Sequence, residues 1–337
     1  MPARRISDEQ NNELVRSAIE QAEAAATTDA EFAQILRAVY LQSHPVMSRQ
    51  LPVIRVRSAR GAAAAPPQAD PDFHIYEDPR FLKNARAMAA RVKARLRIMG
   101  GTTVMGNEFP DCVAVGAVPK GKKKGDWQCT GTLIAPNVVV TACHCSELAT
   151  QVHFGNDVTK KGTVIGVSKA VRHPGYDKSQ EERDDLLVLV LEKKATVAPR
   201  LIADSASIDA ATDGRAVGFG NVDSTGSIGY GVKRMVDIPI ASNACRGTLK
   251  GKGTDAKRYG CNRDVELVAG KPMLAKDSCS GDSGGPFYIP KGKTWLLAGA
   301  TSRATTSAIR TCGDGGIYLR LDKYREWIED VAKVKLL

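Results

Sequence analysis

The sequence lacks the features that mark membrane-spanning proteins, proteins with a secretory signal and nucleic-acid binders. None of its eight cysteines precedes Cys112, and no apolar run approaches the roughly twenty residues of a membrane helix. The first residues show no charged segment followed by an apolar core and a cleavage site, which is the pattern of a secretory signal. Aromatic residues make up 5% of the chain, and no aromatic or groove-reading element of a nucleic-acid binder is visible. We therefore expect no membrane span and no nucleic-acid partner.

Positive charge is in excess. Lysine and arginine number 48 against 37 aspartates and glutamates, so the formal net charge is +11. Part of the excess lies in the run Lys120–Lys124, which suits a solvated surface loop as well as a site for a polyanion. A polyanion-binding protein that uses this run is therefore one hypothesis that the composition leaves open.

The chain divides into three regions of different composition. Residues 1–59 are predicted to form a helical N-terminal region, because Ser7 can cap a first helix and apolar residues recur at helical spacing. Residues 60–97 begin as an Ala- and Pro-rich linker and continue as a basic, propeptide-like segment. Residues 98–337 contain every cysteine and are long enough to enclose two hydrophobic cores.

Three residues of this last region have the types that nucleophilic acyl transfer needs. Ser283 lies between glycines in the run Gly281–Pro286, and His144 follows an apolar strand pattern. Asp185 opens the apolar run Leu186–Leu191. Taken singly, each residue has an ordinary interpretation as a turn, packing or solvated residue. Together, in the order His, Asp, Ser, they predict a serine protease.

The chemistry explains why these residue types occur together. A serine hydroxyl is a weak nucleophile until a neighbouring base takes its proton, and His144 can act as that base near neutral pH. Asp185 would hold the ring in the useful tautomer and stabilise the imidazolium as it forms. The glycines around Ser283 allow a tight turn, so we assign the oxyanion hole to the amides of Gly281 and Ser283.

The motifs resemble those of the trypsin-like (chymotrypsin-fold) serine proteases. The resemblance covers about seven tenths of the chain, from Ile98 to Leu337. Its matching pieces are Ile98–Gly101, Glu108–Pro110, Gly131–Ile134, Thr141–Cys145, His173–Tyr176, Asp184–Leu187, Asp277–Pro286, Gly315–Tyr318 and Tyr324–Ile328. The resemblance implies an all-β fold of two six-stranded antiparallel β-barrels with a C-terminal helix, here preceded by the mostly helical N-terminal extension.

The same resemblance implies a substrate preference. Asp277 lies six positions before Ser283, where trypsin-like enzymes place the carboxylate at the floor of the S1 pocket, which favours Lys or Arg at P1. The other S1 residues that it implies are Ser278, Ser302, Ala304 and Gly316, and the hydroxyl of Ser302 would also support the triad aspartate. Arg303 replaces the usual tryptophan and Ala304 the usual glycine, so preferences beyond P1 do not follow from the resemblance.

Activation by proteolysis is also implied. Arg97 precedes Ile98, whose surroundings resemble the new N-terminus of activated enzymes, and whose ammonium would pair with Asp282. Because Arg97 matches the expected cleavage preference, we predict a zymogen that activates itself.

The cysteines indicate an oxidised domain. The family spacing implies the disulfides Cys129–Cys145, Cys245–Cys261 and Cys279–Cys312. Cys112 and Cys143 remain; pairing them is the economical expectation, although two free thiols fit the count equally. The Cys-His-Cys sequence at 143–145 also suggests zinc, but the expected disulfide would consume Cys145, so we expect no metal and no other cofactor.

The function expected from the sequence is thus a serine endopeptidase that acts on protein or peptide substrates after Arg or Lys. Protein inhibitors are further expected partners. The alternative is a catalytically silent binding or regulatory module on the same fold. Cysteine usage favours a secreted or other extracytoplasmic setting, although no signal peptide is visible and a cytosolic enzyme with reduced thiols stays open.

Overall fold

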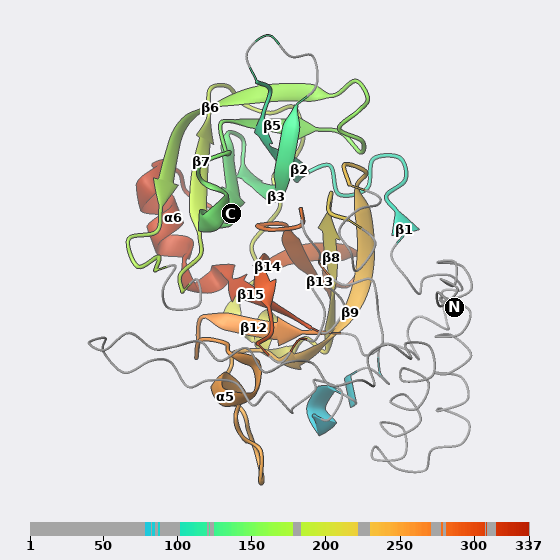
Figure 1. Ribbon diagram of the computed structural model, residues 1–337, viewed down its shortest axis with the longest axis vertical. Helices are drawn as coiled ribbons and strands as arrows, with labels where there is room; N and C mark the ends of the chain where they lie inside the picture. The colour runs from blue at the N-terminus through green and yellow to red at the C-terminus, as the bar shows by residue number, and fades with distance from the viewer. Residues whose placement is uncertain are drawn as a thin grey trace, which may run out of the picture.

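The fold was analysed in a computed structural model of the chain (Figure 1). It describes residues 78–81, 83–84, 87, 102–119, 121, 125–177, 183–221, 230–270, 278, 281–306, 308 and 315–336. The predicted helical region at 1–59 and the linker from residue 60 lie outside these residues. So do Arg97, Ile98 and Asp277.

The first half of the described chain forms a closed six-stranded barrel with the strand order β2-β3-β4-β7-β6-β5. Every neighbouring pair in it is antiparallel. Its strands are β2 (Cys112–Ala117), β3 (Asp126–Ala135), β4 (Val138–Thr141), β5 (Gln151–Phe154), β6 (Thr163–Arg172) and β7 (Leu187–Leu191).

The second half forms another antiparallel barrel in the order β9-β12-β15-β14-β13-β8, which closes because β8 also pairs with β9. The strands are β8 (Asp213–Gly218), β9 (Arg234–Ser242), β12 (Glu266–Ala269), β13 (Pro286–Lys291), β14 (Thr294–Ala304) and β15 (Gly316–Arg320). A short strand, β1 (Thr102–Thr103), is added along β9.

The remaining elements are short. They are the 3-10 turns η3 (Cys143–Cys145) and η4 (Leu321–Lys323), the helices α4 (Ser205–Ala210), α5 (Asp255–Tyr259) and α6 (Arg325–Ala332), and the hairpin strands β10 (Thr248–Leu249) and β11 (Gly253–Thr254). Among the described residues, no helix is both long and apolar enough to cross a bilayer.

Alternation of side chains explains how one run of apolar residues serves two cores. Along β7, Leu187, Leu189 and Leu191 point into the core of the first barrel. Val188 points the other way, into a larger cluster that also contains Leu297 of the second barrel. Successive side chains of a strand face opposite sides, so a strand buried on both faces reads as a continuous apolar run. An apolar cluster therefore joins the two barrels.

The C-terminal helix α6 packs against β7 of the first barrel, next to β6 in the view of Figure 1. Ile328 on this helix is fully buried in the cluster between the barrels. The predicted pair of six-stranded barrels and the C-terminal helix are thus confirmed, and the two halves of the chain are joined by an apolar interface.

Candidate active site

Sheet register brings His144 and Asp185 together. Thr141, the last residue of β4, pairs with Leu187, the first residue of β7. His144 lies three residues after this point on η3, and Asp185 lies two residues before it. Because β4 and β7 are antiparallel, the end of one strand and the start of the other meet at the same edge of the barrel.

The carboxylate of Asp185 contacts His144 at two atoms. The Nδ1 atom of the ring is 2.8 Å from Asp185 Oδ2, and the backbone N–H of His144 donates to Oδ1 at 2.9 Å. Asp185 is fully buried, whereas the side chain of His144 is 21% exposed. A carboxylate beside Nδ1 favours a proton on that atom, which makes Nε2 of the neutral ring the acceptor. The pair can therefore present a general base at the surface.

A third group completes the environment of the carboxylate. Ser302 on β14, expected to support the aspartate, donates its hydroxyl to Asp185 Oδ2 at 2.8 Å and is itself buried. The carboxylate of Asp185 thus contacts the ring and backbone of His144 as well as the Ser302 hydroxyl. The second barrel thus helps to fix the aspartate that lies at the edge of the first.

The segment before Asp185 is braced by the start of the C-terminal helix. Asp184 has a φ of 50°, in the left-handed region, and its Oδ1 accepts from the hydroxyl of Tyr324 at 2.6 Å. The ring of His173 packs edge-on against both Tyr324 and Trp327, with centroids 5.1 and 4.7 Å apart. Helix α6 therefore supports the backbone that carries Asp185.

Ser283 lies in a turn in which glycines have special backbone conformations. Gly281 and Gly284 have φ values of 98° and 75°, a region that residues with a Cβ rarely adopt. A Cβ on Gly284 would overlap Thr141 Oγ1 and the backbone nitrogen of Ala142, which shows how closely the turn approaches the segment leading to His144. The carbonyl of Ser283 is also 3.9 Å from the Cys145 sulfur.

Thr130 of β3 fastens this turn to the first barrel. Its backbone N–H donates to the carbonyl of Ser283 at 2.9 Å, and its hydroxyl donates to the carbonyl of Gly281 at 2.8 Å. The same hydroxyl accepts from the N–H of Phe219 at 3.2 Å. One buried side chain therefore links the turn that bears Ser283 to both barrels.

Asp282 is enclosed by glycine backbone. Its Oδ1 accepts from the N–H of Gly220 at 2.7 Å. A Cβ on Gly220 would lie 2.6 Å from the Asp282 carboxyl carbon, and a Cβ on Gly218 would overlap Oδ1. The two glycines therefore make room for this carboxylate. The activation residues Arg97 and Ile98, expected to act with it, lie outside the described residues.

Four of the five residues expected around S1 lie within the described chain. Gly316 and Ala304 are partners across β14 and β15. A Cβ on Gly316 would lie 3.1 Å from the Tyr318 hydroxyl and 3.2 Å from Ser278 Oγ, and these two oxygens are 3.1 Å apart. Ser302 lies two residues before Ala304 on the same strand. The fifth residue, Asp277, lies outside the described residues.

Arg303 forms an ion pair that the sequence did not predict. Its Nη1 lies 2.9 Å from Glu266 Oε1 and its Nη2 lies 3.0 Å from Oε2, in a two-pronged contact. Nη2 also donates to the carbonyl of Gly260 at 3.0 Å. Glu266 is fully buried on β12. The guanidinium on the strand that carries Ser302 is thus neutralised from within the second barrel.

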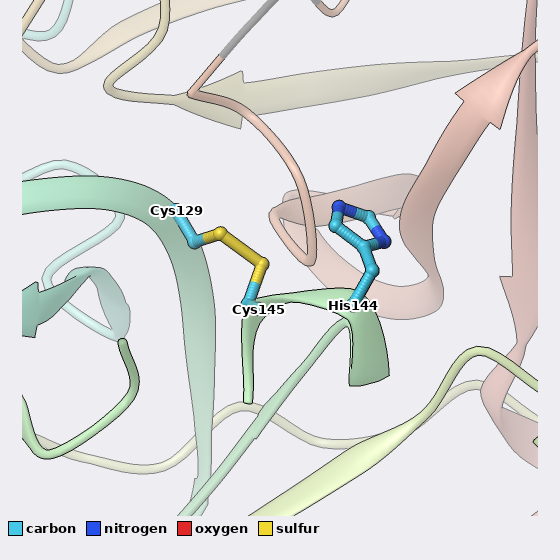
Figure 2. A group of neighbouring side chains, drawn as sticks. All are labelled: Cys129, His144 and Cys145. Atoms are coloured by element: carbon cyan, nitrogen blue, oxygen red, sulfur yellow. A yellow bond between two sulfur atoms is a disulfide. The ribbon is translucent and has the colours of Figure 1, made fainter. Parts of the chain in front are cut away.

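The disulfide Cys129–Cys145 lies beside the His144 ring (Figure 2). The disulfide Cys245–Cys261 is also present, and both agree with the family spacing. The sulfurs of Cys129 and Cys145 and a ring nitrogen of His144 lie within 4.8 Å of one another, close enough for a metal site. The disulfide between the two sulfurs leaves neither of them as a thiolate ligand. The predicted pair Cys279–Cys312 lies outside the described residues.

The expected pairing of Cys112 with Cys143 is wrong, because both are free and buried. Cys112 belongs to the cluster between the barrels, where its sulfur lies 3.7 Å from the carbonyl of Val217. Cys143 lies in η3, where its thiol is close to the charge of Asp185 and to the backbone of His173. Burial, reinforced by the charge of Asp185, raises the pKa of Cys143 to about 12. The two thiols face different parts of the molecule, and the alternative of two free thiols holds.

Comparison with known proteins gives a consistent assignment. The profile of the Trypsin family matches residues 98–328. Anionic trypsin of Bos taurus is 31% identical over 242 residues, covering 69% of this chain and 89% of the relative. Cationic trypsin-3 of Rattus norvegicus is 30% identical over 244 residues, with coverage of 70% and 90%. Kallikrein-14 of Homo sapiens is 29% identical over 260 residues, with coverage of 74% and 90%. The chain belongs to the trypsin family of serine proteases.

Sequence reasoning missed three residues that support the site. Thr130 gave no signal, because a threonine in an apolar strand is ordinary. The sequence indicated Tyr324 only as part of the matching piece Tyr324–Ile328, and its contact with Asp184 depends on the path of α6. Arg303 in place of the usual tryptophan was the signal for Glu266, because a buried guanidinium requires a partner of opposite charge.

Proposed function

We propose that the protein is a serine endopeptidase that cleaves peptide bonds after Arg or Lys through His144, Asp185 and Ser283. The observation that carries the proposal is the contact of Asp185 with both the ring and the backbone of His144, at 2.8 and 2.9 Å, beside the turn that bears Ser283. Membership of the trypsin family supports the same roles.

The reaction proceeds in two halves. Ser283 Oγ attacks the scissile carbonyl carbon while His144 Nε2 takes its proton, and the tetrahedral oxyanion accepts hydrogen bonds from the backbone N–H groups of Gly281 and Ser283. The imidazolium, stabilised by Asp185, returns the proton to the leaving amine, and an acyl-enzyme remains. Water then attacks the acyl carbonyl carbon while His144 Nε2 takes its proton. The imidazolium returns this proton to Ser283 Oγ as the ester bond breaks, which releases the acid and the free serine.

The P1 preference rests on Asp277. A carboxylate at the floor of S1 pairs with a guanidinium or ammonium group, whereas an apolar side chain would leave it buried and unpaired. The positions of Ser278 and Gly316 around the Tyr318 hydroxyl support a pocket at this place on β15. The substrates are proteins or peptides, and protein inhibitors that present Arg or Lys at P1 would occupy the same pocket.

Synthesis as a zymogen is part of the proposal. Hydrolysis after Arg97 would free the ammonium of Ile98, which pairs with Asp282 and orders the oxyanion hole and S1. The glycine-lined surroundings of Asp282 support this role, since no Cβ from Gly218 or Gly220 crowds its carboxylate.

Processed and unprocessed protein should be assayed on a small arginyl chromogenic peptide and labelled with a serine-directed fluorophosphonate. We expect hydrolysis and labelling in the processed form only, and neither in Ser283→Ala. Asp277→Asn should keep the label but lower kcat/KM for the arginyl peptide by at least about a hundredfold. Processed, oxidised wild-type protein that neither hydrolyses the peptide nor takes the label would refute the proposal.

Autoactivation has a separate test. Purified Ser283→Ala protein should stay uncut at Arg97, and a trace of active wild-type enzyme should restore the cut, as read by intact mass spectrometry. Unaided processing of Ser283→Ala would show that another protease activates the chain.

A further inference from the structure

A short segment before the activation site is packed onto the second barrel. Residues 78–81 and 83–84, drawn in blue in Figure 1, contact α5 and β9 through hydrogen bonds of Asp78 with Arg258 and of Asn84 with Ile240. Thirteen residues, 85–97, separate Asn84 from the proposed scissile bond. The propeptide-like region is therefore attached to the catalytic domain by more than its covalent link.

Asp78 is the buried charge at the centre of this attachment. Its side chain is fully buried, and Oδ2 accepts from the hydroxyl of Tyr259 at 2.6 Å and from Arg258 Nη2 at 3.2 Å. Arg258 is also fully buried. Burial opposes ionisation of Asp78, but hydrogen bonds from Arg80 and Tyr259 outweigh it and lower the pKa of the carboxyl. An ionised Asp78 thus meets an interior cation of the catalytic domain.

Arg80 makes the reciprocal contact. Its Nη2 and Nη1 donate to the two carboxylate oxygens of Asp255 at 2.5 and 3.2 Å, a two-pronged pair with a fully buried partner. The guanidinium lies directly over Gly247, where any Cβ would overlap Nη1. Such pairing adds geometric specificity as well as energy. The second barrel therefore offers a shaped place for this arginine.

Two further residues extend the contact beyond the charges. Phe81 is fully buried, and Asn84 Nδ2 donates to the carbonyl of Ile240 on β9 at 2.6 Å. Departure of the segment would expose the Phe81 ring. It would also leave Arg258 and Asp255 each without one of its opposite charges, which is costly for buried groups.

Chemistry leaves only non-covalent means of attachment after processing. Residues 1–97 contain no cysteine, so they have no thiol with which to form a disulfide to the rest of the chain. We propose that residues 78–84 stay bound to the surface formed by α5, Gly247 and β9 after cleavage at Arg97. The active enzyme is then a two-chain molecule in which the chain that ends at Arg97 is held to the rest by ion pairs. This inference rests on the proposed processing, but not on the catalytic chemistry.

The test uses the full chain with Ser283→Ala, so that the molecule cannot cut itself. Residues 93–97 are replaced by the recognition sequence of a site-specific protease that leaves Ile98 as the new N-terminus. An affinity tag at residue 1 immobilises the cleaved protein, and release of the 98–337 chain is followed over time. We expect the larger chain to stay bound through washing.

Variants then locate the contact. Asp78→Asn and Arg80→Ala should each speed release by about tenfold to a hundredfold, the range for losing a hydrogen-bonded charge. Lys83→Ala, at an exposed position of the same segment, should release no faster than the parent. Tyr259→Phe removes only the hydroxyl that donates to Asp78 and should also speed release, so it decides the matter if Asp78→Asn does not fold.

Two results would overturn the inference. One is loss of the 98–337 chain from the parent protein during washing, and the other is release from Asp78→Asn, Arg80→Ala and Tyr259→Phe as slow as from the parent. Because Ser283 is absent throughout, failure here is separate from failure of the peptidase assays, which would concern the proposed function alone.

Discussion

Asp185 and Ser302 come from different barrels and meet in a hydrogen bond of 2.8 Å, in which the serine hydroxyl donates to the carboxylate that holds His144. The bond ties the geometry of His144 and Asp185 to the relative position of the two barrels. Substitution of either residue tests the bond, and we expect a larger loss of activity from Asp185 than from Ser302.

Asp185→Asn should lower kcat by about 10⁴-fold, because an amide in place of the carboxylate favours the wrong tautomer of His144. Ser302→Ala removes one of several hydrogen bonds to the same charge and should cost about tenfold in kcat/KM. Both are measured on the arginyl peptide with processed enzyme, after thermal unfolding shows that each variant is folded. An Asp185→Asn enzyme that retains more than about a hundredth of kcat would remove the aspartate from its proposed role.

Arg303 and Glu266 provide a test of stability rather than chemistry. Glu266 is fully buried, and Arg303 supplies its opposite charge in a two-pronged contact. In the Ser283→Ala background, Arg303→Met should lower the free energy of unfolding by about 3–5 kcal/mol, because it leaves a buried carboxylate without its cation.

The double variant Arg303→Met/Glu266→Leu should regain most of that loss, because it leaves no buried charge. Urea unfolding of the wild-type pair, both single variants and the double variant gives the coupling energy. Additive losses in the double variant would mean that the pair contributes nothing as a pair.

Much of this architecture could be predicted from the sequence, and the reason is local. The Ser283 turn, the apolar strand before His144 and the run after Asp185 each form a short motif. The two barrels followed from the resemblance that those motifs carry. In the structure, the pairing of β4 with β7 then brings His144 and Asp185 together.

What could not be predicted depends on contacts between distant segments. Asp78 and Arg258 are 180 positions apart, and nothing in either local sequence indicates the other. Thr130 likewise contacts residues 89 and 151 positions away, and Glu266 pairs with Arg303, 37 positions away. The number of cysteines could not show the state of Cys112 and Cys143. One thiol lies between the barrels and the other in η3, and the sequence does not indicate either location.

Gly281 offers a test of the oxyanion hole. Its φ is 98°, and a Cβ there would lie 2.9 Å from the Cα of Gly220, so Gly281→Ala must shift the backbone that supplies the amide. We expect kcat to fall by about 10²–10³-fold, the effect of losing one oxyanion donor. KM should change far less.

Gly251 provides the matched control. It has a φ of 78° between β10 and β11, and a Cβ there would meet no atom within 4 Å. Gly251→Ala therefore carries the same kind of backbone strain, about 1–2 kcal/mol, away from the site. Equal loss of kcat in both variants would show that general destabilisation, and not the oxyanion hole, accounts for the result.

The thiols can be counted directly. Protein unfolded in denaturant with an alkylating agent, and without reductant, should gain two adducts per chain, on Cys112 and Cys143. Native protein should gain none, since both thiols are buried and burial raises the pKa of each. Intact mass spectrometry reads the count.

The other counts have distinct meanings. Four adducts would show that Cys279 and Cys312 are reduced, contrary to the predicted third disulfide. No adducts in denaturant would mean that Cys112 and Cys143 are oxidised after all. Full reduction before alkylation provides the reference of eight.

His153 should make the two-barrel domain less stable in mild acid. The ring is buried beside Trp127, with centroids 5.4 Å apart, and its Nδ1 has no hydrogen-bond partner within the described part of the chain. Burial, reinforced by the charge of Lys233, lowers the pKa of His153, and contacts with Lys160 and Asp157 only partly oppose this. The folded protein therefore holds this imidazole neutral over a range in which an unfolded chain would protonate it.

The sign of the pH effect follows from proton counts. Between the lowered pKa and the ordinary value of about 6.5, the unfolded state binds more protons, so stability rises with pH. The contribution of His153 is complete above pH 6.5 and is lost as the pH falls below it. His153→Gln cannot titrate, so its unfolding free energy should fall less between pH 7 and pH 5 than that of the parent, both in Ser283→Ala. Because His173 and the carboxylates contribute to both curves, the difference between them isolates His153, and parallel curves would show that this ring has no part in the acid sensitivity.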